Sequence, residues 1–321
     1  MSFNEYDVEG ARARIAGVAI TTPLLPSVWL SDLTGRPIWL KLECLQVTGS
    51  FKLRGATNRI LSLDEEQRRR GIIATSSGNH GLATSYVAKR EGLAATICVP
   101  EWVDPAKLSA IREFGAEAIA EGETAEDAEG ISLRLARERG LTYVHPFDQP
   151  EVIAGQATVG REILEQQPGI DHVVVPLGGG GLIAGVAVGM KSIDPSIRVT
   201  AVSAERAPVL ARSVEAGRLV RLPERETLAT ALAGNLGPEN HHTLRLASEL
   251  VDDYVEVSDE EMVSAMRFAF RRHALVLEAG GSAAVAAVLS GRLVPDARTA
   301  LVLSGGNIDP AIFTSVVASG E

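Results

Sequence analysis

Short apolar runs alternate with amphipathic stretches along most of the chain. The apolar runs are rich in β-branched residues, which is typical of buried strands, and the stretches between them repeat apolar residues with the period of a helix. We expect strands over Ile38–Leu42, Gly71–Ala74, Ala95–Val99, Glu117–Ala120, His172–Pro176, Arg198–Ser203 and Ala300–Leu303. We expect helices over Gly81–Glu91, Pro105–Phe114, Ala125–Arg139, Gly155–Gln166, Leu182–Ser192 and Ser258–His273.

This alternation predicts an α/β fold in which helices cover a mostly parallel sheet. Several expected strands end in a turn rich in glycine or serine, and open parallel sheets bind ligands beyond the carboxyl ends of their strands. The block from about Gly71 to Phe147 holds three of these strand–helix alternations. We therefore expect a smaller domain over residues 67–147 and a larger, discontinuous domain over residues 1–66 and 148–321.

Composition narrows the class of protein. The 321 residues are 45% apolar, enough for a sizeable core, and the net charge of −10 argues against a nucleic-acid surface, which needs a basic stripe. No apolar run approaches the ~20 residues of a membrane span, and the polar segment Met1–Glu5 does not resemble a signal peptide. Cys44 and Cys98 make neither a disulfide framework nor a metal cluster. We expect a cytoplasmic enzyme with no membrane or nucleic-acid partner.

Lys52 stands in an unusual setting for a lysine. It follows the aromatic Phe51 and has Gly49, Ser50 and Gly55 within three positions. Small residues let a flat ligand approach the backbone, and a lysine shielded from water can lose its proton near neutral pH. An uncharged lysine is a nucleophile that forms Schiff bases with aldehydes. The simpler interpretation is a solvated lysine, because lysine is rarely buried.

The segment Ser76-Ser77-Gly78-Asn79-His80-Gly81 follows an expected strand and opens a helix. Ser and Asn are common helix caps, which is the simpler interpretation. The segment nevertheless supplies more donors than a cap needs. Hydroxyl groups together with the free amides of a helix start suit a carboxylate.

Four consecutive glycines, Gly178, Gly179, Gly180 and Gly181, form a second turn between a strand and a helix. Successive amides in such a turn can point at one anion, and the helix dipole adds to the attraction. The segment is not a Walker loop, because no Gly-Lys-Ser/Thr follows, and no acid stands where a dinucleotide fingerprint places it. The pattern favours a phosphate site over a flexible hinge.

A third turn holds Ser304, after the apolar strand near the C-terminus. Its hydroxyl could simply satisfy a backbone group. A phosphate site, a Schiff-base lysine and a carboxylate clamp together describe pyridoxal phosphate holding an amino acid.

With these residues in place, the chain resembles the fold-type-II pyridoxal-phosphate enzymes, specifically the threonine/serine dehydratase and serine racemase group. The resemblance runs from Ala11–Ile15 to Ser304–Asn307, and its specific motifs are Gly49–Ala56, Ser76–Gly81, His145–Asp148, Ile153–Gln156 and Gly178–Gly181. It implies a tryptophan-synthase-β-like architecture of two open, mostly parallel twisted sheets flanked by helices. It also implies a smaller domain that closes over the substrate, and a homodimer.

The resemblance also assigns roles to residues. Lys52 would carry the cofactor as a Schiff base and later take the Cα proton, and Ser77 lies where racemases place a proton donor on the opposite face. The expected cofactor contacts are Phe51, Lys52, Asn79, Gly178, Gly179, Gly180, Gly181, Glu278 and Ser304. The expected substrate contacts, for the α-carboxylate, are Ser76, Ser77, Asn79 and His80.

The implied reaction is β-elimination from a β-hydroxy amino acid such as L-threonine or L-serine, giving a 2-oxo acid and ammonia. Ser304 favours this outcome, because a serine cannot hold the cofactor's ring nitrogen protonated as a carboxylate would. When the β-hydroxyl leaves, the electron pair left at Cα forms the Cα–Cβ double bond, so it need not be held on the cofactor ring.

Some residues depart from the pattern of the group. Its divalent-cation site is built from a Glu, a main-chain carbonyl four residues on and an Asp or Ala/Gly six residues on; here Glu205 is present, and Ala211 adds no second carboxylate. One carboxylate is a poor cage for a hard cation, so we expect no metal. Thr230–Ala233 replaces an Asp-Gly-rich segment near the substrate. The chain ends soon after Asn307, so we expect no regulatory domain. We expect four histidines at the surface or at helix caps: His172, His241, His242 and His273.

Alternatives remain open within and outside the group. The altered Thr230–Ala233 segment and the Ser203–Pro208 stretch resemble those of dehydratases of hydroxyectoine utilisation, which would act on a hydroxylated diamino acid. Serine racemase is a further alternative. Cysteine synthases resemble the chain less, because Leu53-Arg54 and His80 differ from their motifs. From a different class, the chain could be a non-catalytic protein that binds pyridoxal phosphate.

Overall fold

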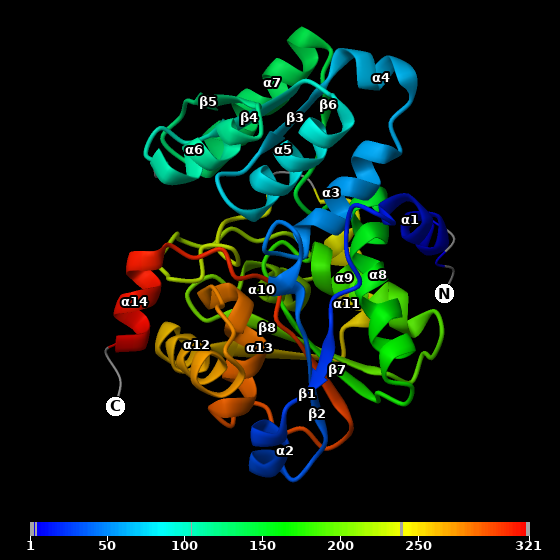
Figure 1. The fold of residues 1–321 in the computed structure, drawn as a ribbon, viewed down its shortest axis with the longest axis vertical. Helices are drawn as coiled ribbons and strands as arrows, with labels where there is room; N and C mark the ends of the chain where they lie inside the picture. Colours follow the sequence, from blue (N-terminus) through cyan, green and yellow to red (C-terminus); the bar gives the residue numbers. More distant parts are fainter. Residues whose placement is uncertain (1–2, 4, 104, 238–239, 319–321) are drawn as a thin grey trace.

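The computed structural model describes residues 3, 5–103, 105–237 and 240–318, and arranges them as two sheets covered by helices (Figure 1). The larger sheet has six strands in the order β1-β2-β10-β7-β8-β9, and the smaller has four in the order β5-β4-β3-β6. Strand β1 is antiparallel to β2, and the other neighbours pair in parallel. The expected α/β class with two mostly parallel sheets is confirmed.

The seven expected strands are present, each shifted by at most one residue at an end. Three further strands were not expected: β1, β6 and β9. The first two are very short, and β9 is an edge strand whose side chains are mostly half-buried, so its apolar pattern is weak. The strands are β1 Leu24–Pro26, β2 Ile38–Lys41, β3 Ile72–Thr75, β4 Ala95–Val99, β5 Glu117–Ala120, β6 Thr142–Tyr143, β7 His172–Pro176, β8 Arg198–Ala204, β9 Asp253–Val257 and β10 Thr299–Val302.

The six expected helices are present as α5, α6, α7, α8, α9 and α12. Helix α8 begins five residues earlier than expected, because Pro150 occupies its first turn, where the missing amide costs nothing. The helices are α1 Val8–Ile15, α2 Val28–Thr34, α3 Lys52–Leu61, α4 Glu65–Arg70, α5 Asn79–Glu91, α6 Pro105–Glu113, α7 Ala125–Arg139, α8 Pro150–Gln166, α9 Gly181–Lys191, α10 Val209–Ala216, α11 Thr243–Leu250, α12 Asp259–His273, α13 Ala279–Leu289 and α14 Pro310–Ala318, with a 3-10 turn, η1, over Glu43–Leu45.

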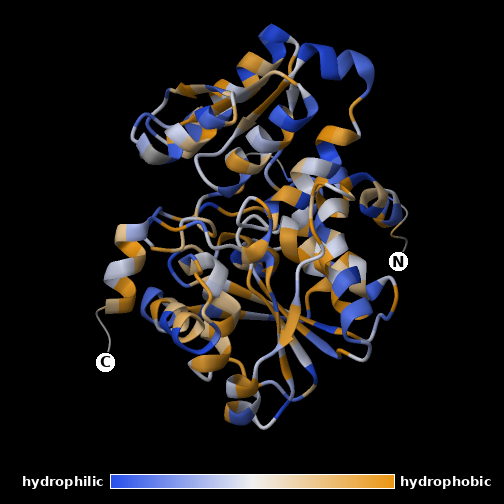
Figure 2. Cartoon of the chain, in the orientation of Figure 1, coloured by the Kyte–Doolittle hydropathy of each residue, from blue (hydrophilic) through white to orange (hydrophobic). Residues whose placement is uncertain are grey.

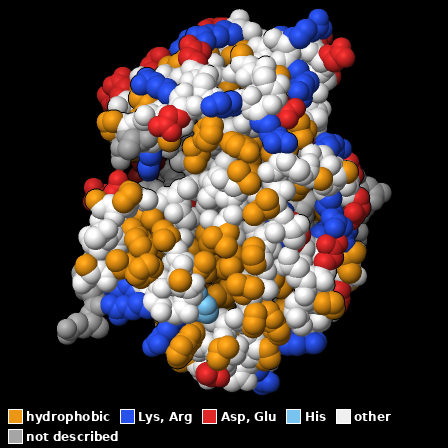
Figure 3. Space-filling view, viewed as in Figure 1, with side chains coloured by type: hydrophobic (Ala, Val, Ile, Leu, Met, Phe, Trp, Pro, Cys, Tyr) orange, Lys and Arg blue, Asp and Glu red, His pale blue; other side chains and the backbone are white. Residues whose placement is uncertain are grey.

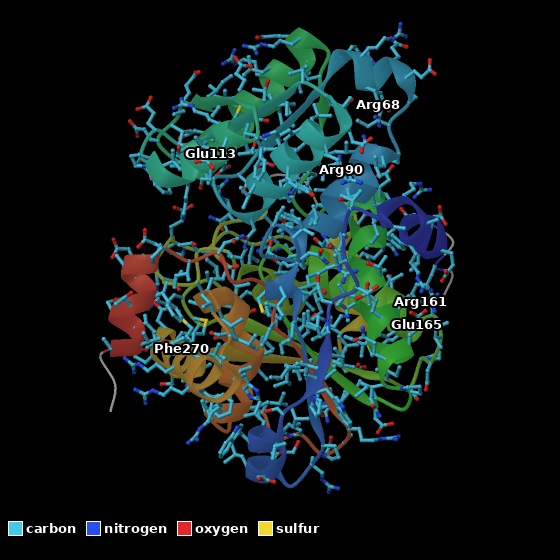
Figure 4. All side chains as sticks on the ribbon, viewed as in Figure 1. Arg68, Arg90, Glu113, Arg161, Glu165 and Phe270 are labelled. Carbon is cyan, nitrogen blue, oxygen red and sulfur yellow. The ribbon has the colours of Figure 1, made fainter. Side chains whose placement is uncertain are left out.

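The larger sheet is buried on both faces. One core cluster joins its central strands to α8 and α9, and another joins them to α12 and α13. Figure 2 shows the result: the central strands, α9 and α13 are largely hydrophobic, while outer helices carry a polar face. Helix α1 lies on the outer side of α8, where Arg12 pairs with Glu165 at 2.7 Å; Figure 4 labels Glu165 and Arg161 on that helix.

The four strands of the smaller sheet lie between residues 72 and 143, inside the range expected for the smaller domain. Helix α3 complicates a clean division. Its Leu53, Ala56 and Ile60 belong to the same core cluster as Ile72 of the smaller sheet. The division at residues 66 and 148 therefore stays a prediction, and α3 packs on both sides of it.

One expectation about the histidines is wrong. His172 is buried within the larger sheet at the start of β7, where its Nε2 lies 2.7 Å from the Thr200 hydroxyl. Desolvation lowers the pKa of His172 to about 4, so the ring is neutral at neutral pH. The hydroxyl of a neighbouring strand explains how a polar ring is accommodated there.

A network of buried charges joins β2, η1, α3 and α8. The Arg54 guanidinium contacts both oxygens of Glu43 at 2.8 Å and both oxygens of Glu162 at 2.6 and 2.8 Å. Lys41 donates to Glu162 at 2.6 Å and to the Thr22 carbonyl at 2.7 Å. The side chains of Arg54, Glu43 and Lys41 are fully buried.

We expect Arg54→Ala to lower the free energy of unfolding by about 3–5 kcal/mol, because it leaves Glu43 buried without the cation that it contacts and takes one of the two cations from Glu162. Urea unfolding followed by circular dichroism measures the change. Arg134→Ala is the control, since it removes only exposed pairs with Glu121 and Glu138 and should cost less than about 0.5 kcal/mol. Equal losses in the two variants would contradict the role of the network.

Candidate active site

The expected site residues lie in the segments that follow β2, β3, β7 and β10, except Glu278, which directly precedes α13. Two of these segments are joined directly: Phe51 donates its backbone amide to the Ser304 carbonyl at 3.1 Å, and Ser50 forms an isolated bridge with Gly305. The Asn79 and Gly305 segments meet at Glu278, whose carboxylate lies where a side chain at position 305 would project. Segments far apart in the sequence thus gather around Lys52.

Lys52 is the first residue of α3 and is half-buried. Its Nζ donates to the Pro146 carbonyl at 2.6 Å and lies 5.2 Å from the centre of the Phe51 ring. Desolvation lowers the pKa of Lys52 to about 8, although the negative charge of Glu278 acts in the opposite direction. A useful fraction of the amine is therefore neutral and nucleophilic near neutral pH.

The glycine loop, Gly178–Gly181, is closely walled. A Cβ at position 179 would overlap the Phe147 ring, and one at position 181 would lie 2.8 Å from the Cβ of Phe147. Gly180 has φ = 87°, a left-handed conformation that favours glycine. Among the described residues, the amides of Gly178–Gly181 meet no protein acceptor. They stand at the start of α9, where backbone amides and the helix dipole attract a phosphate.

The segment Ser76–His80 turns from β3 into α5. The Ser76 hydroxyl accepts from the Gly78 amide at 3.1 Å, and α5 begins at Asn79 without a side-chain cap. The first-turn amides of α5 are then available to a carboxylate. The His80 ring is buried, and its Nε2 lies 2.9 Å from the Val144 carbonyl. Desolvation, helped by the charge of Lys52, lowers the pKa of His80 to about 3.

A neutral His80 therefore donates its Nε2 hydrogen to Val144. In this arrangement the ring is engaged with the backbone that follows β6, so a carboxylate in the turn would meet the amide of His80 and not its ring. The predicted clamp role of His80 stays a prediction, restricted to its backbone.

Asn79 and Glu278 form a polar pair beside Lys52. Asn79 Nδ2 donates to Glu278 at 2.6 Å, and Asn79 Oδ1 accepts from Asn307 Nδ2 at 2.7 Å. Asn307 also donates to the Thr48 carbonyl at 2.8 Å. Desolvation raises the pKa of Glu278 to about 7, while the hydrogen bond from Asn79 lowers it.

Four residues with contacts in the site, Asn307, Pro146, Phe147 and Asp148, lie in the motifs but have no role predicted from the sequence. Asn307 orients the Asn79 amide, Pro146 accepts from Lys52, and Phe147 walls the glycine loop. Their presence in motifs is the only sequence signal for them, because each contacts a partner far away in the chain.

Among the described residues, no three His, Cys, Asp or Glu side chains gather as a metal site. Glu205 is exposed, and Ala211 is buried and has no side-chain ligand atom. The expectation that no metal binds stays a prediction. The described helices include none that is both long and apolar enough to span a membrane.

The described residues fit pyridoxal phosphate. The glycine loop offers amides at a helix start, and its walls leave no room for side chains. The amine of Lys52 has the lowered pKa that Schiff-base chemistry requires. Ser304 is buried on the segment hydrogen-bonded to that of Lys52.

Residues 15–305 match the model of the pyridoxal-phosphate dependent enzymes. The chain belongs to this family, and its cofactor is pyridoxal phosphate. It is 40% identical to the L-threonine ammonia-lyase of Thermotoga maritima over 314 residues, which cover 98% of this chain and 78% of that protein.

Two solved structures place it within the threonine/serine dehydratase and serine racemase group. Maize serine racemase has a TM-score of 0.91 at 35% identity, covering 98% of this chain and 97% of that one. The threonine deaminase of T.th. has a TM-score of 0.86 at 41% identity, covering 94% of this chain and 98% of that one.

We expect Lys52 in the cofactor-free chain to react with an acylating reagent with a pH midpoint near 8, against about 10.4 for an unperturbed lysine. Glu278→Gln removes a negative charge that favours the ammonium form, so it should lower the pKa of Lys52 and speed its labelling at pH 7. Peptide mass spectrometry measures the rate at Lys52. Glu138→Gln, an exposed change, is the control; a midpoint near 10, or one that Glu278→Gln leaves unmoved, would refute this electrostatic account.

Proposed function

We propose that this chain is an ammonia-lyase that converts a β-hydroxy amino acid, such as L-threonine or L-serine, into a 2-oxo acid and ammonia. The observation that carries the proposal is the Lys52 amine, whose pKa is lowered to about 8 and which donates to the Pro146 carbonyl, one residue before the Phe147 that packs on the glycine loop. The names of the threonine ammonia-lyase and threonine deaminase relatives support the same reaction.

Lys52 has two duties in this proposal. As a neutral amine it would hold the cofactor through its aldehyde, and as a free amine it would act as the base for the Cα proton of the substrate. When bound, pyridoxal phosphate supplies the electron withdrawal that makes this proton acidic. The Pro146 carbonyl, 2.6 Å from Nζ, orients the freed amine. The glycine loop binds the phosphate, Phe51 and Ser304 contact the ring, and Asn79 binds its 3-hydroxyl, with Glu278 beside it.

The Ser76–His80 turn binds the substrate carboxylate through its hydroxyls and the first amides of α5. Ser77 stands half-buried in that turn. A proton donor there, on the face opposite Lys52, returns a proton to Cα with inverted configuration. Serine racemase activity is therefore the alternative outcome at the same site, and the maize relative supports it.

A second substrate class, hydroxylated diamino acids, is favoured by the groove beside the Thr230–Ala233 segment. Thr230 and Ala233 line an open groove of about 680 Å³ whose other walls include Trp102, Glu224 and Glu226. The same segment packs on the glycine loop, since a Cβ at Gly178 would lie 2.9 Å from the Cα of Leu232. Arg206, Arg225 and Asp259 also line the groove, so its carboxylates exceed its cations by one, and this small excess beside an aromatic ring suits the second amine of a diamino acid.

A substrate panel tests these assignments. The purified chain with pyridoxal phosphate should release 2-oxo acid from L-threonine or L-serine, with chiral chromatography used to detect D-serine. Lys52→Ala should lose the visible Schiff-base absorbance and at least about 10³-fold in rate, because it removes both the cofactor link and the base. Lys89→Ala, an exposed control, should retain both. If no amino acid in the panel changed the Schiff-base absorbance of the chain, the chain would be a cofactor-binding protein and not an enzyme.

The proposed oligomer is a homodimer formed through an exposed apolar face around β1, β2 and α2. Figure 3 shows hydrophobic side chains gathered on this side of the molecule. An apolar patch of this kind marks an association surface. The exposed members of the face are Leu25, Val28, Trp29, Leu33, Leu45 and Val47.

The proposed location is the cytoplasm, which suits two buried free cysteines, Cys44 and Cys98.

We expect Val28→Glu to dissociate this dimer, because a carboxylate buried in an apolar interface has no partner. Sedimentation equilibrium should report about twice the 34.0 kDa chain mass for the unaltered protein and about one chain mass for the variant. Ile193→Glu changes an equally exposed apolar residue outside this face and should leave the dimer intact. A monomeric unaltered protein would overturn the proposal.

A further inference from the structure

Five consecutive residues between β6 and α8 contact different parts of the site; we call Val144–Asp148 the junction strip. The Val144 carbonyl accepts from the buried ring of His80, and the Pro146 carbonyl accepts from Lys52. Between them, His145 Nδ1 accepts from the amides of Phe147 and Asp148 at 3.1 and 2.8 Å, which folds the strip into a tight turn.

Phe147 is the strip's contact with the glycine loop. Its ring fills the space beside Gly179, and its backbone lies against Gly181, where a Cβ would be 2.9 Å from its Cα. The Phe147 ring also packs edge-on against His145, with centroids 4.5 Å apart. The position of the loop therefore depends on the position of the strip.

Asp148 ends the strip with a carboxylate that reaches across the chain to the start of α11. It accepts from the amides of His241 at 2.6 Å, His242 at 3.0 Å and Thr243 at 2.8 Å. Asp148 is buried, with 7% of its surface exposed. Helix α11 has no side-chain cap of its own from His242, so Asp148, 95 residues before Thr243, serves as the cap.

The start of α11 is also a wall of the glycine loop. A Cβ at Gly180 would lie 2.9 Å from the Cβ of Thr243, which is fully buried. Asp148 thus fixes the loop from two sides: through Phe147, its neighbour in the chain, and through Thr243, its hydrogen-bond partner. The Asp148 carboxylate accepts three backbone N–H groups, and each of these hydrogen bonds is strengthened by the negative charge of the acceptor.

We infer that Asp148 is a positioning residue for the cofactor phosphate. By capping α11 it holds Thr243 and Phe147 against the glycine loop, so that the loop amides keep the spacing that a phosphate group needs. The inference rests on the proposed assignment of Gly178–Gly181 as the phosphate site. It predicts that losing the carboxylate weakens the recognition of the phosphate and leaves the reaction of Lys52 with the aldehyde intact.

The test compares pyridoxal phosphate with pyridoxal, which has the aldehyde but no phosphate. The full chain, freed of cofactor, is titrated with each and the Schiff-base absorbance gives the two dissociation constants. Asp148→Ala should raise the constant for pyridoxal phosphate at least about tenfold and change that for pyridoxal less than about twofold. Asp148→Asn keeps one acceptor oxygen, so its dissociation constant for pyridoxal phosphate should lie between those of the unaltered chain and of Asp148→Ala. This variant provides a readout if the alanine variant does not fold.

Asp64→Ala is the matched control. Asp64 caps α4 at the surface by accepting from the Gln67 amide at 2.8 Å, so this variant loses a helix cap far from the glycine loop. It should leave both dissociation constants unchanged. Equal weakening of both ligands in Asp148→Ala and Asp148→Asn would mean a general structural defect and would overturn the inference.

Failure of the phosphate site and failure of the Asp148 role give different results. If the unaltered chain bound pyridoxal as tightly as pyridoxal phosphate, the assignment of Gly178–Gly181 as a phosphate site would be wrong. An unaltered chain that prefers the phosphate, together with Asp148 variants that keep the preference in full, would overturn only the role of Asp148.

Discussion

The buried ion pairs of Arg54 are the interaction on which the active site depends most. Helix α3 begins at Lys52 and has no side-chain cap, so its first turn needs another anchor. Arg54, in that turn, supplies one by contacting Glu43 before the helix and Glu162 on α8. Buried ion pairs add little net stability, because desolvation offsets their attraction, but breaking one is costly. Their contribution here is geometric, because they hold the first turn of α3, which carries Lys52, against Glu43 and α8.

A second constraint joins the two sheets at the same place. Helix α3 shares a core cluster with the smaller sheet, and the junction strip runs from β6 of that sheet into α8, which packs on the larger one. Lys52 thus sits on one connection and its acceptor, the Pro146 carbonyl, on the other. Any movement of the smaller sheet relative to the larger one changes the surroundings of the Lys52 amine.

The sequence predicted what short-range patterns encode. Strands such as β7 are continuous apolar runs, and the glycine loop and the Lys52 segment are unusual in their local composition. Helix α13 was missed because it is buried all round, so its residues show no helical period. Asp148 and Asn307 were given no role because their partners lie 95 and 228 residues away, and His172 was misplaced because the hydroxyls that accommodate it belong to neighbouring strands. Long-range hydrogen bonds leave no periodic signal.

The electrostatics of the site follow from burial more than from charge. Desolvation brings the pKa of Lys52 down to about 8 and that of Glu278 up to about 7, so both groups titrate near neutral pH. A base performs best when its pKa lies near the working pH, since it is then free to accept a proton and able to release it. The glycine loop offers an anion backbone amides and a helix dipole, and neither is a titratable cation. If this loop is the phosphate site, as proposed, the phosphate needs no arginine, whose charge would depress the pKa of a nearby amine further.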